Sequence, residues 1–234
     1  MNNVKDILLS NPIFGLLLTL FCYYIGTKIH KVLGWSFLQP IVIATIMIII
    51  FLKNVGISFE EYHAQNQLLN YMLPVTAVAL AIPLYKNFHI LKRHSFPLMM
   101  GISAGTITTM LSVVVFGKLF GADKVLIASM LPKSATNPIA IEVSSIIGGI
   151  PSLTVALVVI TGIFGGTFGP ELLNLFRIKS PIARGIAIGS MSHAVGTARA
   201  FKEGEIEGAM SSLAMAISGT LTAILSPLFL FLFL

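Results

Sequence analysis

Two stretches of the sequence place polar side chains where a small anion could bind, and both interrupt long apolar runs. The first is LPKSATNPIA, residues 131–140. Its candidate substrate-binding residues are Lys133, Ser134, Thr136 and Asn137. Pro138 is typical of a first helical turn, and the free amides of a helix start favour an anion. We therefore expect an anion site at this tip. The alternative is that Lys133 reaches lipid headgroups and the hydroxyls cap the helix.

The second stretch begins at residue 192 and reads SHAVGTAR. Its candidate substrate-binding residues are Ser192, His193, Gly196, Thr197 and Arg199. A histidine that titrates near neutral pH could take part in proton coupling, although a lone histidine is more often a structural donor. Arg199 could hold a carboxylate through two hydrogen bonds, or it could lie in the cytoplasmic interface.

Glu142 joins His193 as a candidate for coupling or for an ion pair. A carboxylate inside a membrane is costly, so it needs a partner such as Lys133, or else it faces an outer aqueous vestibule. Enzyme signatures are absent, because the sequence has no HExxH, no G-x-S-x-G, no phosphate loop and no paired intramembrane aspartates. We therefore expect no enzyme activity, no metal site and no cofactor.

The elements that must position these residues are membrane-spanning helices. Hydrophobic residues make up 56% of the chain and charged residues 10%, whereas a soluble domain carries roughly a quarter charged residues. Apolar runs lie near 12–31, 38–54, 71–86, 96–120, 151–174 and 209–234. Each run approaches the ~20 residues that cross a bilayer as a helix. The sequence predicts an all-α polytopic membrane protein with about six full transmembrane helices.

Basic clusters set the expected topology. They lie at 28–31, 86–94 and 177–184, and such clusters mark cytoplasmic loops. Their place at the ends of apolar runs explains the net charge of +6 without a nucleic-acid partner. With these loops inside, the segment 125–150 begins and ends outside, which predicts two half-helices joined by an irregular tip. In the competing topology both broken segments cross fully, and 177–184 lies outside.

An internal repeat strengthens the prediction of broken or re-entrant segments. Residues 125–142 align with 186–203 at an offset of 61 residues. The identical pairs are Ile127/Ile188, Ser129/Ser190, Met130/Met191, Thr136/Thr197 and Glu142/Glu203. Each copy follows one long apolar helix, so the two units must face opposite ways, and broken segments in inverted units indicate a transporter site near the bilayer midplane.

We expect a single integral membrane domain over residues 1–234. Its parts are the first three helices (1–95), two candidate inverted units (96–150 and 151–208) and a last helix (209–234). Small residues recur four positions apart in GISAG (101–105), GIFGG (162–166), GGTFG (165–169) and GIAIG (185–189). Such spacing lets helices approach closely, within one chain or in a homo-oligomer.

Four stretches resemble the LrgB/CidB family, and the resemblance covers nearly the whole chain. They are AIPLYKN (81–87), MLPKSATNPIAIEVS (130–144), FRIKSPIARGIAIG (176–189) and SHAVGTARAFKEGEIEGAMSSLAM (192–215). The resemblance implies a multi-pass protein of the bacterial inner membrane, produced alongside a small holin-like LrgA/CidA partner. The family's tip commonly has threonine where this chain has Asn137.

Two functions are expected from the residues and the resemblance together. The first is a carrier for small monocarboxylates of the pyruvate, lactate, glycolate or glycerate class, because relatives resemble pyruvate facilitators and the plastidial glycolate/glycerate translocator carries a similar domain. The alternative is an antiholin-like regulator of murein hydrolase activity and autolysis that binds the holin-like partner.

Overall fold

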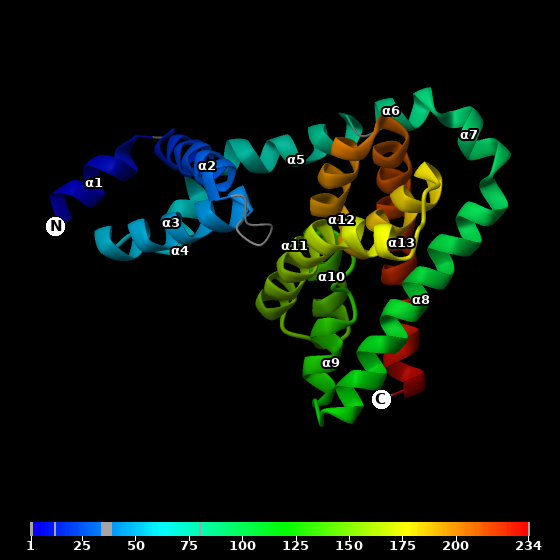
Figure 1. Ribbon diagram of the computed structural model, residues 1–234. Helices are drawn as coiled ribbons and strands as arrows, with labels where there is room; N and C mark the ends of the chain where they lie inside the picture. Colours follow the sequence, from blue (N-terminus) through cyan, green and yellow to red (C-terminus); the bar gives the residue numbers. More distant parts are fainter. Residues whose placement is uncertain (1, 12, 34–38, 80, 234) are drawn as a thin grey trace. The chain divides into compact units, whose positions relative to one another are not determined.

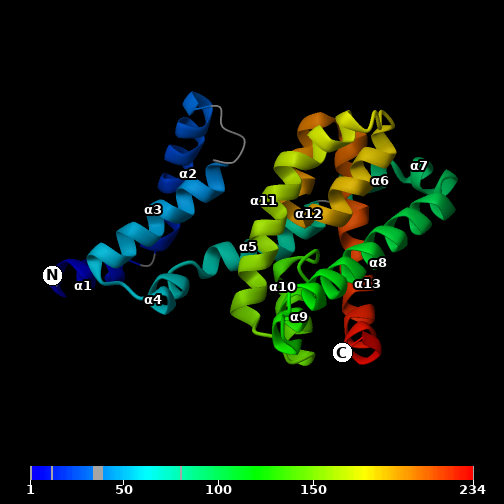
Figure 2. The ribbon, with the colours of Figure 1, turned by 60° about the horizontal axis from the view of Figure 1, so that its bottom comes forward.

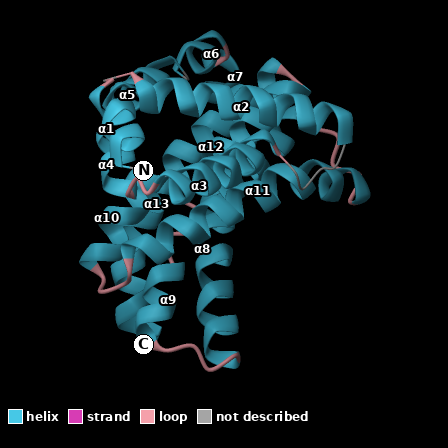
Figure 3. Cartoon of the chain, turned by 90° about the vertical axis from the view of Figure 1, so that its left-hand side faces the viewer, coloured by secondary structure: helices cyan, strands magenta, loops and turns pink. Residues whose placement is uncertain are grey.

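The described residues form helices joined by turns and loops, with no strand among them, which confirms the predicted all-α fold (Figure 3). A computed structural model covers residues 1–234 and describes all of them except 1, 12, 34–38, 80 and 234. The chain divides into two compact units, Met1–Ala79 and Leu80–Leu234. The boundary falls within the apolar run 71–86, in which α5 ends at Ala79 and α6 begins at Ala81.

The described residues of unit 1 form five helices: α1 (Asn2–Ser10), α2 (Phe14–Leu33), α3 (Pro40–Val55), α4 (Phe59–Ala64) and α5 (Gln67–Ala79). The α2 and α3 helices pack together, and a Cβ added at Gly26 would lie 2.5 Å from the carbonyl oxygen of Pro40. Glycine is therefore required at that crossing. Ser58 and Glu61 form a reciprocal capping box at the start of α4, and Lys5 forms a 2.9 Å ion pair with Glu61.

Unit 2 contains the two stretches with candidate site residues (Figure 1). Its helices are α6 (Ala81–Lys86), α7 (Phe88–Arg93), α8 (Ser95–Leu119), α9 (Lys124–Met130), α10 (Asn137–Ile146), α11 (Pro151–Leu175), α12 (Pro181–Glu203) and α13 (Glu205–Phe233). Among all described helices, α2, α8, α11 and α13 are long and apolar enough to cross a membrane, and α3 is a shorter apolar helix. The protein is thus a multi-pass membrane protein.

The segment 125–150 folds back on itself as a helical hairpin made of α9, a short tip and α10. The Thr154 hydroxyl at the start of α11 contacts the Ser129 carbonyl of α9 at 2.9 Å and the Ser144 hydroxyl of α10 at 2.7 Å. The Ile150 amide donates to the Ser129 hydroxyl at 2.8 Å. Since both arms meet the same end of α11, the segment enters and leaves at one end, as the charge pattern predicts.

A second hairpin lies within α12. His193 has φ 38 and ψ −135, which breaks the helix into two arms. The Arg184 and Glu203 side chains form a 2.8 Å ion pair although they are 19 positions apart, a separation that would be about 28 Å in a straight helix. The arms therefore fold back, and neither broken segment crosses the unit in the way that the competing topology requires.

The two hairpins enter unit 2 from opposite ends. Figure 2 shows α9 and α10 at one end of α11, with α12 along its other part. Because α8 leads to the first hairpin and α11 leads from there to the second, the two helix-plus-hairpin units are inverted. The 61-residue offset aligns Ser129 with Ser190, and each lies near the end of the first arm of its hairpin. The N-caps of these two arms, Asp123 and Ser180, are 57 residues apart (180 − 123 = 57), so the first arm of the second hairpin is longer.

Candidate functional site

The two hairpin tips meet at one turn of α11. The Val158 side chain forms a buried cluster with Ala135 of the first tip and Ala140 of α10. The carbonyl oxygen of the same residue lies 2.8 Å from Nε2 of His193 at the second tip. A carbonyl only accepts, so Nε2 donates this hydrogen bond. Residues 131–136 and 192–193 are thereby brought together from opposite ends of the unit.

The first tip is a compact turn buried in protein. The Lys133 amide donates to Met130 at 3.1 Å, and the Ala135 amide donates to Pro132 at 2.9 Å. Thr136 is the N-cap of α10, but its side chain makes no capping hydrogen bond. The alternative in which the tip hydroxyls cap the helix is therefore not realised at Thr136, and its hydroxyl does not cover the positive end of α10.

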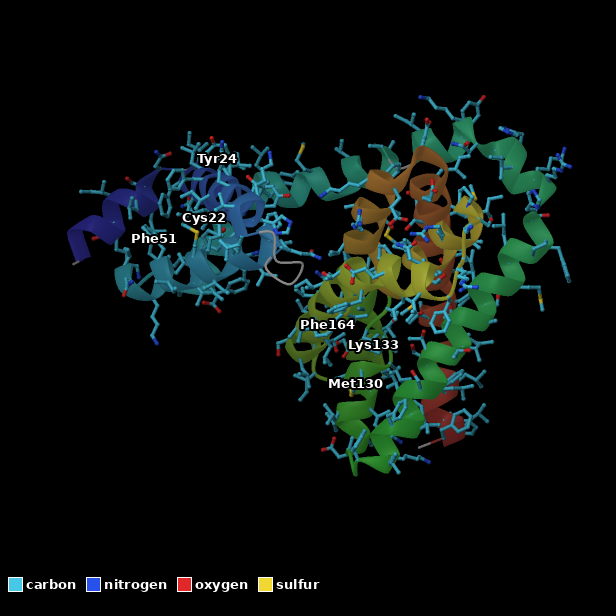
Figure 4. All side chains as sticks on the ribbon, viewed as in Figure 1. Cys22, Tyr24, Phe51, Met130, Lys133 and Phe164 are labelled. Atoms are coloured by element: carbon cyan, nitrogen blue, oxygen red, sulfur yellow. The ribbon has the colours of Figure 1, made fainter. Side chains whose placement is uncertain are left out.

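Lys133 and Ser134 bring polar groups into this buried turn, as Figure 4 shows for Lys133 on the hairpin. Ser134 is 6% exposed, and its hydroxyl has no hydrogen-bond partner among the described residues. Lys133 is partly buried and forms no ion pair with a described carboxylate. It does interact electrostatically with His193. A partly buried cation without a counterion and a buried hydroxyl without a partner are each costly.

The second tip carries the fully buried hydroxyl of Ser192, which also has no hydrogen-bond partner within the described part of the chain. Glycines of α11 make room for it. A Cβ at Gly165 would collide with the Ser192 hydroxyl, and one at Gly162 would lie 2.6 Å from the imidazole Cε1 of His193. The GIFGG motif therefore serves packing within the chain. The positive φ of His193 is a strained conformation, which the bond to Val158 helps to hold.

The other candidate residues of the second stretch are engaged in packing or lie further along the second arm. The Thr197 hydroxyl lies 2.9 Å from both the His193 carbonyl and the Ser211 hydroxyl, so it is engaged in packing against α13. Gly196 lies against Ser192 and Ile188 and lets the two arms approach. Arg199 lies further along the second arm and faces Glu203 at 3.9 Å. This position agrees better with the alternative in which Arg199 lies in the cytoplasmic interface than with a bidentate contact to substrate.

The Lys133–Glu142 ion pair that the sequence suggested is not formed. Glu142 is exposed and is in no ion pair with a described residue, which agrees with the alternative of an aqueous-facing carboxylate. Asn137 is also exposed, at the first position of α10. Within the described part of the chain, no three His, Cys, Asp or Glu side chains converge on a point where a metal ion could bind.

Sequence reasoning missed the residues that fix each hairpin to its neighbours. In the first hairpin these are Ser129, Ser144 and Thr154. At the second base Arg184 donates to Glu203, to the Asn174 amide oxygen at 2.8 Å and to the Ile178 carbonyl at 3.0 Å. Ser129 belongs to the internal repeat and Arg184 to the basic cluster 177–184, so the sequence offered a signal for each. Their hydrogen-bond partners could not be predicted, because they depend on how each hairpin folds back.

Comparisons with known proteins show what this chain is similar to. A family model described as the LrgB-like family matches residues 19–232. "Uncharacterized protein YxaC" of Bacillus subtilis (strain 168) is 39% identical over 218 residues, which cover 93% of this chain and 95% of the relative. "Antiholin-like protein LrgB" of Bacillus cereus (strain B4264) is 36% identical over 220 residues, 94% of this chain and 96% of the relative. No solved structure matches the chain.

Proposed function

This chain is a member of the LrgB-like family of membrane proteins, and from that premise we propose that it carries small monocarboxylates across the bacterial cell membrane. The substrate class is that of pyruvate, lactate, glycolate or glycerate. The site lies where the two hairpin tips meet on α11, and its binding groups are the Lys133 ammonium and the hydroxyls of Ser134 and Ser192.

One observation carries the proposal: the two hairpin tips that contact Val158 each carry a buried hydroxyl with no partner among the described residues, and the first tip also carries a partly buried lysine that pairs with no described carboxylate. Buried polar groups are normally hydrogen-bonded, so unpaired ones at one site need an explanation. A carboxylate would accept from both hydroxyls and neutralise the ammonium, and a hydrogen bond to a charged group contributes about 1.5–3 kcal/mol. The uncapped start of α10 adds a favourable partial charge.

Opposed hairpins also suit alternating access. Each tip closes the site from its own end, so movement of one hairpin away from α11 would open the site to one side of the membrane only. The base of the second hairpin is fixed by the Arg184–Glu203 pair, which would leave its tip as the part that moves.

A second candidate function is antiholin-like control of murein hydrolase activity through a holin-like, LrgA-type partner. The printed names of the Bacillus cereus relatives favour it. The two functions are compatible, because carboxylate flux changes the proton gradient and so affects autolysis. Substitutions in GIFGG cannot separate them, since Gly162 and Gly165 already lie against the second tip.

The experiment is uptake of labelled pyruvate into proteoliposomes that contain the purified chain, with and without an LrgA-like partner. Lactate, glycolate and glycerate serve as competitors. We expect saturable uptake that Ser134→Ala and Ser192→Ala each reduce at least tenfold, which corresponds to about 1.4 kcal/mol. Ser145→Ala, an exposed serine on α10, is the matched control and should leave uptake unchanged. Absence of carboxylate flux under both conditions would leave the regulator as the better reading.

A further inference from the structure

A groove of about 530 Å³ lies between the first half of α8 and the first arm of α12, and its inner end at Ser190 and Met191 lies next to the second hairpin tip. Its walls are mostly apolar, with His94 and Ser180 at one end and Gly105, Ser190 and Met191 at the other. One wall of the groove is α8, a helix that is long and apolar enough to span the membrane. The groove is therefore a candidate surface for another molecule inside the bilayer.

The groove has room because two glycines of α8 are not needed by the chain's own packing. A Cβ at Gly101 would lie 3.9 Å from Ile186, and one at Gly105 would lie 3.8 Å from Ser190, both ordinary contacts. In contrast, a Cβ at Gly185 or Gly189 would collide with the carbonyls of α13. The glycines of GISAG thus leave a space that unit 2 does not fill, with the four-residue spacing that admits a transmembrane helix.

The Ser190 side chain indicates which kind of molecule would bind in the groove. It lines the groove, is 4% exposed, and its hydroxyl has no partner among the described residues. A lipid acyl chain offers this hydroxyl neither a donor nor an acceptor. A helix with a serine, threonine, asparagine or glutamine at the same depth would satisfy it.

The ends of the two walls favour one orientation of such a helix. Both α8 and the first arm of α12 begin at the mouth of the groove, beside His94 and Ser180, so two positive helix ends face it. A helix that ends there brings its negative end to them and runs opposite to α8. A two-fold dimer with its axis along the membrane normal would pair α8 with α8 in parallel, which does not provide this arrangement.

We propose that the groove is the docking site for a transmembrane helix of a different polypeptide, antiparallel to α8, with a hydrogen-bonding side chain opposite Ser190. The mouth is at the end of unit 2 that carries the basic residues 177–184, so the docked helix ends on the side expected to be cytoplasmic. The inference rests on the LrgA-type partner named above and is independent of carboxylate transport.

The test is site-specific photo-crosslinking of the full chain, co-expressed with an LrgA-like holin-like protein, in membranes. The crosslinker replaces Met191 in the groove or, as a matched control, the exposed Val115 further along α8. We expect an adduct with the holin-like protein from position 191 and none from 115. Gly105→Leu, which fills the groove, should abolish the adduct, and Ser190→Ala should reduce affinity about threefold, the effect of one interhelical hydrogen bond.

The variants separate docking from misfolding and from transport. Without the partner, Ser190→Ala should unfold at the same or a higher temperature, because it removes an unpaired hydroxyl, and both variants should keep pyruvate uptake by the chain alone. Equal adducts from positions 191 and 115, adducts only with lipid, or adducts only between copies of this chain would each overturn the proposal.

Discussion

Nε2 of His193 lies 2.8 Å from the carbonyl oxygen of Val158, 35 positions away in the sequence, and this contact joins the tip of the second hairpin to α11. The same turn of α11 packs against the first tip through Ala135. His193 is therefore a positioning residue: it holds the backbone that presents the Ser192 hydroxyl.

Replacing His193 with alanine should loosen the second tip. The change removes the donor to Val158 and leaves a positive φ that alanine adopts poorly, so the free energy of unfolding should fall by about 1–3 kcal/mol. Thermal unfolding in detergent measures the loss, and labelled-pyruvate uptake should fall with it. An unchanged unfolding temperature would show that the contact does not hold the tip.

The Arg184–Glu203 pair should contribute more to stability than the Arg199–Glu203 pair. The side chains of Arg184 and Glu203 are 11% and 15% exposed, whereas that of Arg199 is 43% exposed and 3.9 Å from Glu203. Arg184→Ala leaves a mostly buried carboxylate and should cost about 3 kcal/mol, while Arg199→Ala should cost less than about 1 kcal/mol. Equal losses in the unfolding free energies of the two variants would contradict the fold-back of α12.

Two glycine-to-alanine substitutions should differ in their effect on the free energy of unfolding. Gly165→Ala forces a methyl group into Ser192, so it should lower the free energy of unfolding by about 1–3 kcal/mol and reduce uptake. Gly101→Ala meets only Ile186 at 3.9 Å and should be neutral or stabilising in the isolated chain. A destabilised Gly101→Ala variant would show that the GISAG face is packed within the chain.

The end of unit 2 that carries residues 177–184 should lie in the cytoplasm. A Lys179→Cys variant in a Cys22→Ser background places one thiol in that exposed loop. A membrane-impermeant maleimide should label it in inverted vesicles and not in intact cells. Labelling only from outside would contradict the topology on which the direction of both hairpins rests.

The sequence predicted the first hairpin because charge, length and proline all act locally. The basic loop 177–184 fixed which side the segment 125–150 returns to, and Pro132 and Pro138 located its tip. The second break has no proline or glycine at His193, and only the repeat indicated it. Its contact with Val158 comes from the opposite end of unit 2 and could not be read from spacing.

The orientation of individual side chains was the least predictable part. Thr197 and Arg199 follow the break at His193 by a few residues, so the turn at that single position decides which neighbour each one faces. Glu142 and Lys133 share a hairpin, yet the rotation of α10 leaves Glu142 exposed instead of paired. The small-residue motifs looked alike in sequence, and only their neighbours distinguish Gly165 from Gly101.

Equilibrium binding of labelled pyruvate to the purified chain tests the central claim most directly. Lys133→Met should lose binding and unfold at a higher temperature than the parent chain, because it removes a partly buried charge that has no counterion among the described residues. The double variant Ser134→Ala/Ser192→Ala should lose binding as well, and Ser145→Ala should keep it. Undiminished binding by the folded Lys133→Met and double-serine variants would contradict an anion site between the hairpin tips.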